Sequence, residues 1–162
     1  YSEKAWRMTG VKSHPLLGEI GLDNFAPYLM NRIMGRYNAS LRQEMSALGL
    51  TTPKMRSLAV LAIRDGLLIR ELAVYAVVEQ STLSRALDGL LASGLVHAQS
   101  DPDDNRGTRV FITAEGRDVF AKIWPSMAAS YGQMFQGISE SEQLGFVITL
   151  NKILRNVRKN EF

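Results

Sequence analysis

The sequence predicts a mainly α-helical protein with one small β-hairpin. Apolar residues recur at steps of three or four over several segments of more than ten residues, which is the period of an amphipathic helix. Strands are expected only at two short segments that flank a polar turn and at a shorter stretch before them. Hydrophobic residues make up 46% of the chain and charged residues 22%, as in ordinary globular proteins.

The N-terminal part is expected to contain an irregular arm followed by a long helix. Residues 1–22 hold several glycines and Pro15, which favour irregular backbone. The helix is predicted over 23–48, with Asp23 as its N-cap and Gly49 just beyond its end. Its apolar positions are Phe25, Tyr28, Leu29, Ile33, Tyr37, Leu41, Met45 and Leu48.

Three shorter helices are predicted in the middle of the chain. Thr52-Pro53 is a good helix start, and that helix is expected to end near Asp65-Gly66. A small edge strand at 67–69 precedes a helix over 70–77. After a tight turn at 78–80, Ser81 opens a helix that ends at Gly94.

The hairpin and two more helices complete the chain. Residues 96–99 and 108–112 are predicted strands, with Thr108, Val110 and Ile112 on one face, and 101–107 form the polar tip. Thr113 starts a helix that runs toward Tyr131. Ser139 and Glu142 have the spacing of a capping box, which opens a last helix to about Arg158.

The order of the central elements is that of a winged helix-turn-helix, which we place at about 52–117. In this motif the second helix lies in the major groove, so one face must be apolar and the other short and polar. Residues 81–93 fit, with Leu83, Leu87, Leu90 and Leu91 expected inside. The side chains expected to face DNA are Ser81, Thr82, Ser84 and Arg85, with Asp88 also outward. An ordinary amphipathic surface helix would show the same pattern.

The polar hairpin adds a second candidate contact. Its tip offers one arginine, Arg106, which can enter a minor groove. We expect Asp104 to hold the guanidinium of Arg106 in a bidentate pair. A solvated hairpin with a neutralised ion pair is the alternative.

Several motifs together resemble the MarR family of transcription regulators over roughly residues 25–160. They are LTTPKMRSLAVL, ELAVYAVVEQSTLSRALDGLLASGLV and DPDDNRGTRVFITAEGR. The resemblance implies a homodimeric DNA-binding protein, within residues 23–162, whose dimerisation helices lie at about 23–48 and 118–160. It also implies a small-molecule effector that binds between the dimerisation region and each lobe. We therefore expect a ligand-responsive regulator, a repressor released from a pseudo-palindromic operator on double-stranded DNA.

The chain departs from the family pattern at the wing. The first wing strand usually starts with basic residues, but here it contains His97, Ala98, Gln99 and Ser100, and Asn105 stands where a second arginine is frequent. Fewer phosphate contacts and a weaker salt dependence should follow.

Five residues are candidate effector contacts, and an aromatic carboxylate or its coenzyme A thioester would suit them. Tyr28, Arg32 and Arg36 share one side of the first long helix, and aromatic, methionine and arginine side chains can line a ligand site. Met55 and Trp124 complete the set. Core or dimer-interface packing would also explain the tyrosine, the methionine and the tryptophan.

Other classes of protein fit the sequence less well. The chain has no cysteine, only two histidines, no phosphate-binding glycine loop and no nucleophile motif, so we expect no enzyme, no cofactor and no metal site. The acidic residues at 101–104 lack the later ligands of a calcium loop, since position 112 is Ile112. A winged-helix module that binds protein instead of DNA is the main alternative, because residues 70–117 carry five arginines against seven acidic residues.

Charge and hydropathy bound the partners and the location. The net charge of +3 and the pI of about 9.3 mildly favour a polyanionic partner. No apolar run approaches the roughly 18 residues of a membrane-spanning helix, and residues 1–6 lack the pattern of a signal peptide. We expect a cytoplasmic protein without membrane contact.

Overall fold

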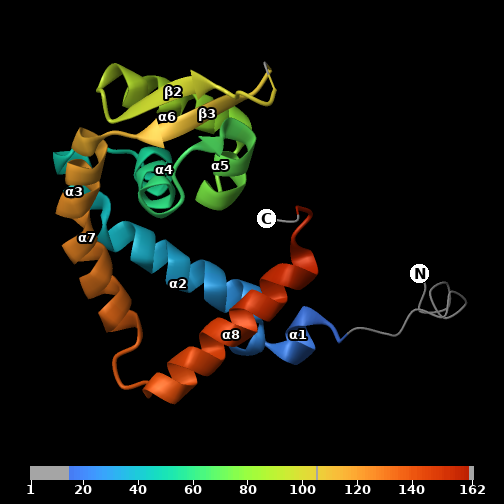
Figure 1. Cartoon of the computed structure of the whole chain (residues 1–162). Helices are drawn as coiled ribbons and strands as arrows, with labels where there is room; N and C mark the ends of the chain where they lie inside the picture. The colour runs from blue at the N-terminus through green and yellow to red at the C-terminus, as the bar shows by residue number, and fades with distance from the viewer. Residues whose placement is uncertain (1–14, 105, 161–162) are drawn as a thin grey trace, which may run out of the picture. The chain divides into compact units, whose positions relative to one another are not determined.

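The computed structural model describes residues 15–104 and 106–160, which divide into two compact units between Tyr37 and Asn38. Asn105 and residues 1–14, most of the predicted arm, lie outside the described residues. The elements, labelled in Figure 1, are α1 (Leu17–Ile20), the 3-10 helix η2 (Leu22–Asn24), α2 (Ala26–Ser40), α3 (Arg42–Ala47), α4 (Thr52–Ile63), β1 (Leu67–Leu68), α5 (Ile69–Ala76), α6 (Gln80–Ala92), β2 (Val96–Ser100), β3 (Thr108–Ile112), α7 (Ala114–Met134) and α8 (Glu140–Val157).

The first unit is more helical than the sequence predicts. The described part of the arm contains α1 and η2 instead of irregular backbone only. Asp23 lies inside η2, so it is not the N-cap of the long helix, which begins at Ala26. The prediction was wrong here because Gly21 at φ +75° permits a tight turn between α1 and η2.

The long helix predicted over 23–48 is two helices, α2 and α3. They are separated at Leu41, whose side chain is fully buried. Met45, one turn later in α3, is also buried, whereas α2 has no buried residue. The apolar pattern continues across the break because it marks positions to be covered, and it does not require one continuous helix.

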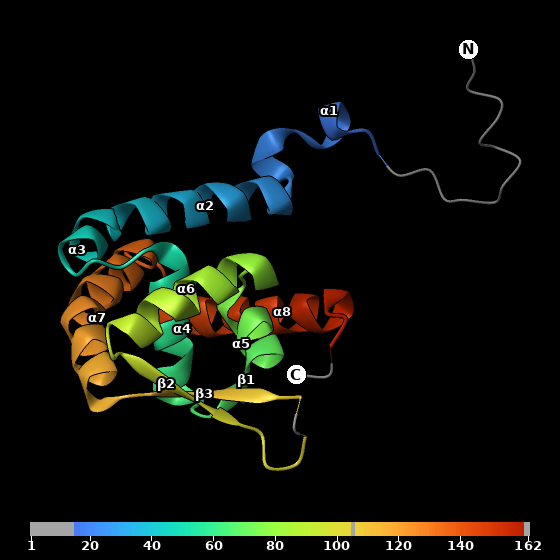
Figure 2. The same cartoon turned by 90° about the horizontal axis from the view of Figure 1, so that it is seen from above.

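The second unit contains the predicted winged helix-turn-helix lobe. Its three-stranded antiparallel sheet has the order β1-β3-β2, with Leu67 opposite Val110 and Val96 opposite Ile112. Helix α4 packs against α5, α6 and β3, and α6 packs against β2 (Figure 1). The hairpin of β2 and β3 extends away from these helices (Figure 2).

The buried core lies in this lobe and in the segments next to it. Its fully buried side chains include Leu58 and Leu61 from α4, Leu72 from α5, and Leu83 and Leu90 from α6. The sheet adds Val96, Val110 and Ile112, as the alternation of β3 predicts. The core therefore holds α6 on one face and leaves its other face free.

The last two helices start as the sequence predicts. The Thr113 hydroxyl accepts from the Gly116 N–H and caps α7. Ser139 and Glu142 form the predicted capping box at α8, and the hydrogen bonds from the Ser139 hydroxyl and N–H hold the pKa of Glu142 below its usual range. Helix α7 contains Pro125 and continues to Met134, beyond the predicted end near Tyr131.

Candidate nucleic-acid interface

Helix α6 has one apolar buried face and one polar exposed face. Leu83, Leu87 and Leu90 are buried as predicted. Leu91 was placed on this face wrongly: it is 42% exposed, and Ala86 is buried in its place. The reason is geometric: at about 100° per residue, Leu83, Ala86, Leu87 and Leu90 share an arc of roughly 100° around the helix, and Leu91 lies just beyond the edge of that arc.

The exposed face of α6 carries all the side chains predicted to meet DNA. These are Ser81, Thr82, Ser84 and Arg85, and Asp88 is exposed with them. Within residues 15–104 and 106–160, the Arg85 guanidinium has no hydrogen-bond or ion-pair partner. A planar cation held on a fixed helix and left unpaired is suited to bidentate contact with guanine or phosphate.

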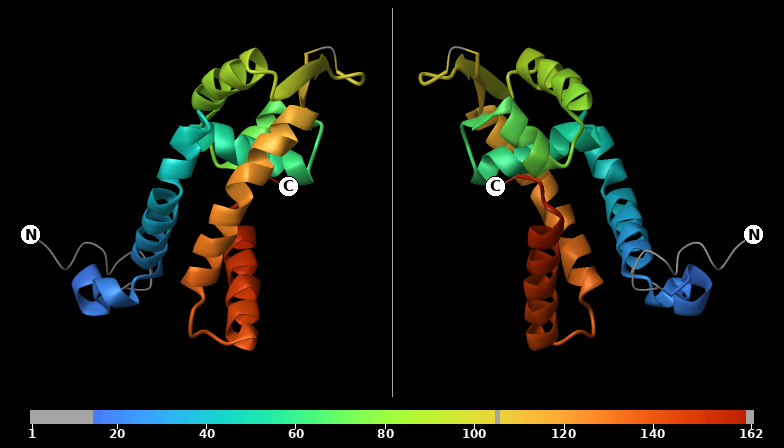
Figure 3. Two further views of the ribbon diagram at one scale, coloured as in Figure 1. Left: turned by 90° about the vertical axis from the view of Figure 1, so that its left-hand side faces the viewer. Right: turned by 90° about the vertical axis from the view of Figure 1, so that its right-hand side faces the viewer.

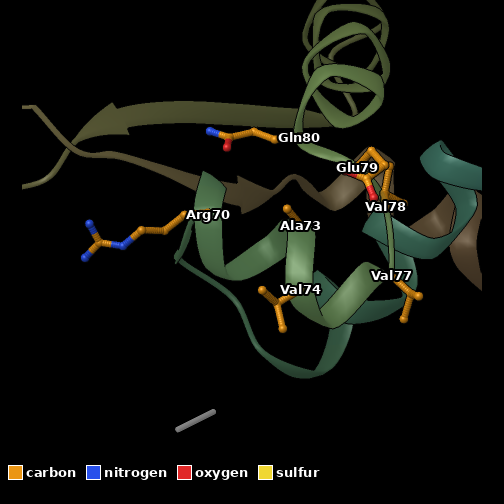
Figure 4. A pocket seen from close by; sticks show the side chains of 7 residues that line it. All are labelled: Arg70, Ala73, Val74, Val77, Val78, Glu79 and Gln80. Carbon is orange, nitrogen blue, oxygen red and sulfur yellow. The ribbon is translucent and has the colours of Figure 1, made fainter. Parts of the chain in front are cut away.

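The turn before α6 is built on an unusual backbone. Val77, the C-cap of α5, has φ +54° and is the one described non-glycine residue with positive φ. Its carbonyl accepts from the Arg56 guanidinium at 3.2 Å, which ties the turn to α4. Figure 4 shows a groove beside this turn, open to solvent and lined by Arg70, Ala73, Val74, Val77, Val78, Glu79 and Gln80. No predicted effector residue lines this groove.

An ion pair fixes the base of the tip loop, where β2 ends and β3 begins. Asp101 is only 4% exposed, and its carboxylate accepts from Nε of Arg109 at 3.2 Å. Arg109 also donates to the Gly66 carbonyl at 2.9 Å, so the hairpin is joined to the turn after α4. The N–H of Asp103 and then the Arg109 guanidinium hold the pKa of Asp101 below its usual range.

The tip of the wing differs from the prediction. The Asp104 carboxylate accepts from the backbone N–H of Arg106 at 2.9 Å and forms no ion pair with its guanidinium. The carboxylate that does hold an arginine is Asp101, at the base of the tip loop. Within the described part of the chain, the exposed Arg106 side chain has no partner. Asp104 therefore shapes the backbone of the tip and leaves the Arg106 guanidinium unpaired.

A glycine fits the tip for a steric reason. A Cβ at Gly107 would lie 2.9 Å from Cβ of Asp101 and 3.0 Å from Leu68. The Gly107 N–H donates to the Asp104 carbonyl, and the Gly107 carbonyl accepts from the Asp101 N–H. These two hydrogen bonds close the loop at the ends of β2 and β3. The tip is therefore fixed to the lobe by close backbone packing as well as by charge.

The motif I-T-x-x-G-R after the wing is structural. Arg117 forms an ion pair with Asp65 at 2.9 Å, and the other oxygen of Asp65 accepts from the Ile112 N–H. A Cβ at Gly116 would overlap the Leu95 carbonyl oxygen, so only glycine fits. Arg117 is one of the five arginines counted in residues 70–117, and no local pattern in the sequence indicates its partner Asp65, 52 residues earlier.

The predicted effector contacts occur in different settings. Arg32 lies over the Tyr28 ring, 5.8 Å from its centroid, and donates to the Tyr28 hydroxyl at 3.4 Å. Arg36, on the same helix, is exposed. Met55 is 3% exposed and belongs to the core, as the alternative interpretation expects, whereas Trp124 is 55% exposed.

Among the described residues, no cluster of histidine or acidic side chains could hold a metal ion. No described helix is long and apolar enough to cross a membrane. In Figure 3, α6 and the wing lie next to each other at the same end of the lobe. An apolar-backed helix with a polar face, set beside a hairpin with an exposed arginine, defines a DNA-binding winged helix-turn-helix protein.

Comparison with known proteins gives the family. The MarR family model matches residues 48–107. A MarR-family transcriptional regulator from Silicibacter pomeroyi is 58% identical, its structure has a TM-score of 0.87, and the match covers 91% of this chain and 100% of that one. The chain belongs to the MarR family of transcription regulators, as the sequence motifs predict.

Two further relatives span most of the chain. The transcriptional repressor IacR of Pseudomonas putida is 26% identical over 146 residues, which cover 90% of this chain and 85% of IacR. CouR from Rhodococcus jostii, solved with p-coumaroyl-CoA, shares the fold with a TM-score of 0.72 at 24% identity, over 82% of this chain and 94% of that one. The MarR family, the Silicibacter pomeroyi protein and IacR are regulators of transcription, so the expectation that the chain is not an enzyme is confirmed.

Proposed function

We propose that the protein is a homodimeric repressor that binds a pseudo-palindromic operator and is released by a small aromatic acid or its coenzyme A thioester. The observation that carries the DNA-binding part is the exposed polar face of α6 beside the wing, with Arg85 and Arg106 both unpaired among the described residues. Ser81, Thr82 and Ser84 would contact bases or phosphates, Arg85 a guanine and Arg106 the minor groove. Asp104 would support Arg106 through the tip backbone.

The apolar surface of α2 and α8 supports a dimer. Neither helix has a buried residue, yet each carries large apolar side chains at successive turns. An uncovered apolar surface of this extent is typical of an interaction site. A two-fold dimer would hold two copies of α6 about 34–36 Å apart, which is one turn of DNA.

The effector class rests on side-chain chemistry and on the fold. Tyr28 and Arg32 form a cation-π pair on α2, and Arg36 on the same helix can also meet a carboxylate. Trp124 offers an exposed ring for an aromatic ligand. The CouR structure holds an aromatic thioester in the same fold. Met55 is buried, so it would contribute only through the packing of the core.

Release follows from differential binding. A ligand weakens operator binding only if it prefers an arrangement of the dimer that fits DNA less well. A tenfold change in operator affinity requires about 1.4 kcal/mol of such preference, which is usual for allosteric coupling. DNA must then weaken ligand binding by the same factor.

The test combines selection of a DNA site with ligand titration. Genomic fragments retained by the protein are trimmed to a duplex, and its affinity is measured by fluorescence anisotropy for the wild type and for Arg85→Ala. We expect specific binding that Arg85→Ala weakens selectively. If the protein retains no duplex, the alternative of a winged-helix module that binds protein instead of DNA would be favoured.

Aromatic acids and thioesters that raise the melting temperature are then added to the complex. We expect at least one to lower operator affinity about tenfold or more, in line with the coupling above. Stabilising ligands that leave operator affinity unchanged would contradict the proposed mechanism.

A further inference from the structure

Helix α6 lacks a side chain at Gly89, where another helix supplies one. A Cβ at Gly89 would lie 2.7 Å from both Cε and Nζ of Lys54. Lys54 is in the first turn of α4, which packs against α6. The end of the Lys54 side chain therefore lies across α6 at the one point of that helix that has no side chain.

The fold itself gains little from this arrangement. A glycine in the interior of a helix costs roughly 0.5–1 kcal/mol relative to alanine. A cation in the first turn of α4 lies at the end where the helix dipole disfavours positive charge. Among residues 15–104 and 106–160, no carboxylate pairs with the half-buried Lys54. Stability alone thus does not account for a lysine over a glycine.

The position of the ammonium on α6 indicates a role. Gly89 lies four residues after Arg85 and seven after Thr82, so the three positions follow one flank of the helix. Positions four apart are neighbours about 5–6 Å apart on a helix surface. Lys54 therefore adds a second positive charge one turn beyond Arg85, on the flank where the polar residues face outward.

We propose that Lys54 is a phosphate-contacting residue of the DNA interface, brought to the surface of α6 by the missing side chain at Gly89. This inference rests on the proposed function, in which the polar face of α6 meets DNA. A lysine ammonium is a compact charge with rotatable donors, suited to a phosphate and carrying no base specificity. The interface is then a composite of α4 and α6.

The test uses three variants of the whole chain and a matched control. Lys54→Gln removes the charge and Gly89→Ala displaces it, since the contact is with the flexible end of the lysine. The double variant joins both changes. Lys152→Gln on α8 removes the same charge from an exposed position elsewhere. Each is titrated by anisotropy against the operator and an unrelated duplex at several salt concentrations, with thermal unfolding as the check on folding.

We expect Lys54→Gln to weaken both duplexes by the same factor. Because each dimer would make two fewer phosphate contacts, the slope of log affinity against log salt should fall by about 1.8, so the affinity lost between 50 and 200 mM salt becomes about twelvefold smaller. Gly89→Ala should weaken binding in the same way without lowering the melting temperature, because alanine favours a helix. In the double variant, the substitution at Gly89 should add nothing to the effect of Lys54→Gln.

Three results would overturn the proposal while leaving the proposed function intact. An unchanged salt slope in Lys54→Gln, with the wild type bound to DNA, would exclude the phosphate contact. If Gly89→Ala binds DNA with the affinity of the wild type, a special role for the lysine position over α6 would be excluded. The same conclusion would follow if Lys152→Gln changed the salt slope as much as Lys54→Gln does. Absence of duplex binding by the wild type would instead overturn the proposed function and this inference with it.

Discussion

At the scale of single residues, pairing separates structural from functional arginines. Arg109 and Arg117 are committed to Asp101 and Asp65. Arg85 and Arg106 are exposed and have no side-chain partner within the described chain. The four side chains are chemically identical and differ only in their surroundings. A guanidinium that already pairs with a carboxylate is less available to DNA than an unpaired one.

We predict that Arg106→Ala weakens operator binding by about 1–3 kcal/mol, which is the range of a good groove contact. The melting temperature should hardly change, since an exposed hairpin tip buries little surface. Anisotropy titration and thermal unfolding measure the two effects. Arg155→Ala, an exposed arginine of α8, is the charge-matched control. Equal affinity of Arg106→Ala and the wild type would mean that the wing does not enter a groove.

A second prediction at this scale concerns the turn between α5 and α6. Val77 is 75% exposed and left-handed, a conformation that costs an L-residue roughly 1–2 kcal/mol. Glycine removes this cost. It also lowers the stability of the folded state by about 0.5–1 kcal/mol, because a glycine loses more conformational freedom when the chain folds. Val77→Gly should therefore raise the free energy of unfolding by about 0.5–1 kcal/mol. Urea unfolding measures it, and Val77→Ala, which keeps the Cβ, should gain less. A less stable glycine variant would show that the turn carries no strain.

At the scale of elements, the tip loop of the wing is held at its base, and Arg106 within the loop has no side-chain partner among the described residues. Asp101 joins β2 to Arg109 on β3, and Arg109 reaches the Gly66 carbonyl. At the tip, the Asp104 carboxylate accepts a hydrogen bond from the Arg106 backbone N–H, and it pairs with no side chain of the described residues. A loop fixed at its base presents Arg106 at a defined place without covering its charge, which a minor-groove contact requires.

This arrangement predicts an acid-sensitive contribution of Asp101 to stability. Because its pKa is lowered in the folded state, the contribution is full above the ordinary value of about 3.9 and is lost as pH falls through the lower folded value. Asp101→Asn should be less stable than the wild type near pH 7, and the difference should shrink below about pH 4. Chemical unfolding from pH 7 to pH 3 measures this difference, in which the titration of Glu142 cancels. A difference that does not vary with pH would contradict it.

At the scale of the whole molecule, the chain has apolar surface that the described residues do not cover. In α8, Leu144 is 62% exposed and Ile148, one turn later, 46%. The buried residues lie between Leu41 and Ile123, so the lobe has its own core without α8. The lobe should therefore tolerate changes in α8 that abolish assembly.

We predict that Leu144→Glu with Ile148→Glu gives a folded monomer at micromolar concentration, where the wild type sediments as a dimer. Two carboxylates in an apolar interface are costly to bury, whereas in a monomer they are solvated. Sedimentation measures the mass and circular dichroism the helix content. Glu140→Gln with Lys152→Gln, two polar positions of α8, is the control. A wild type that sediments as a monomer would contradict the dimer itself.

The sequence by itself determined the features that depend on near neighbours. The Thr113 cap, the Ser139–Glu142 box and the alternation of β3 involve residues within a few positions of each other, and all were predicted. The polar face of α6 was predicted for the same reason, since helical spacing fixes which residues share a face. The motifs that resemble the MarR family could also be recognised from the sequence.

The tertiary structure decided the contacts between segments far apart in the chain. Spacing alone favoured Asp104 as the partner of an arginine, yet the fold pairs Asp101 with Arg109 because antiparallel pairing of β2 and β3 brings these two together. The break at Leu41 depends on packing, as does the contact of Lys54 with α6 at Gly89. Local periodicity specifies which side of an element is covered, and only the packed chain specifies what covers it.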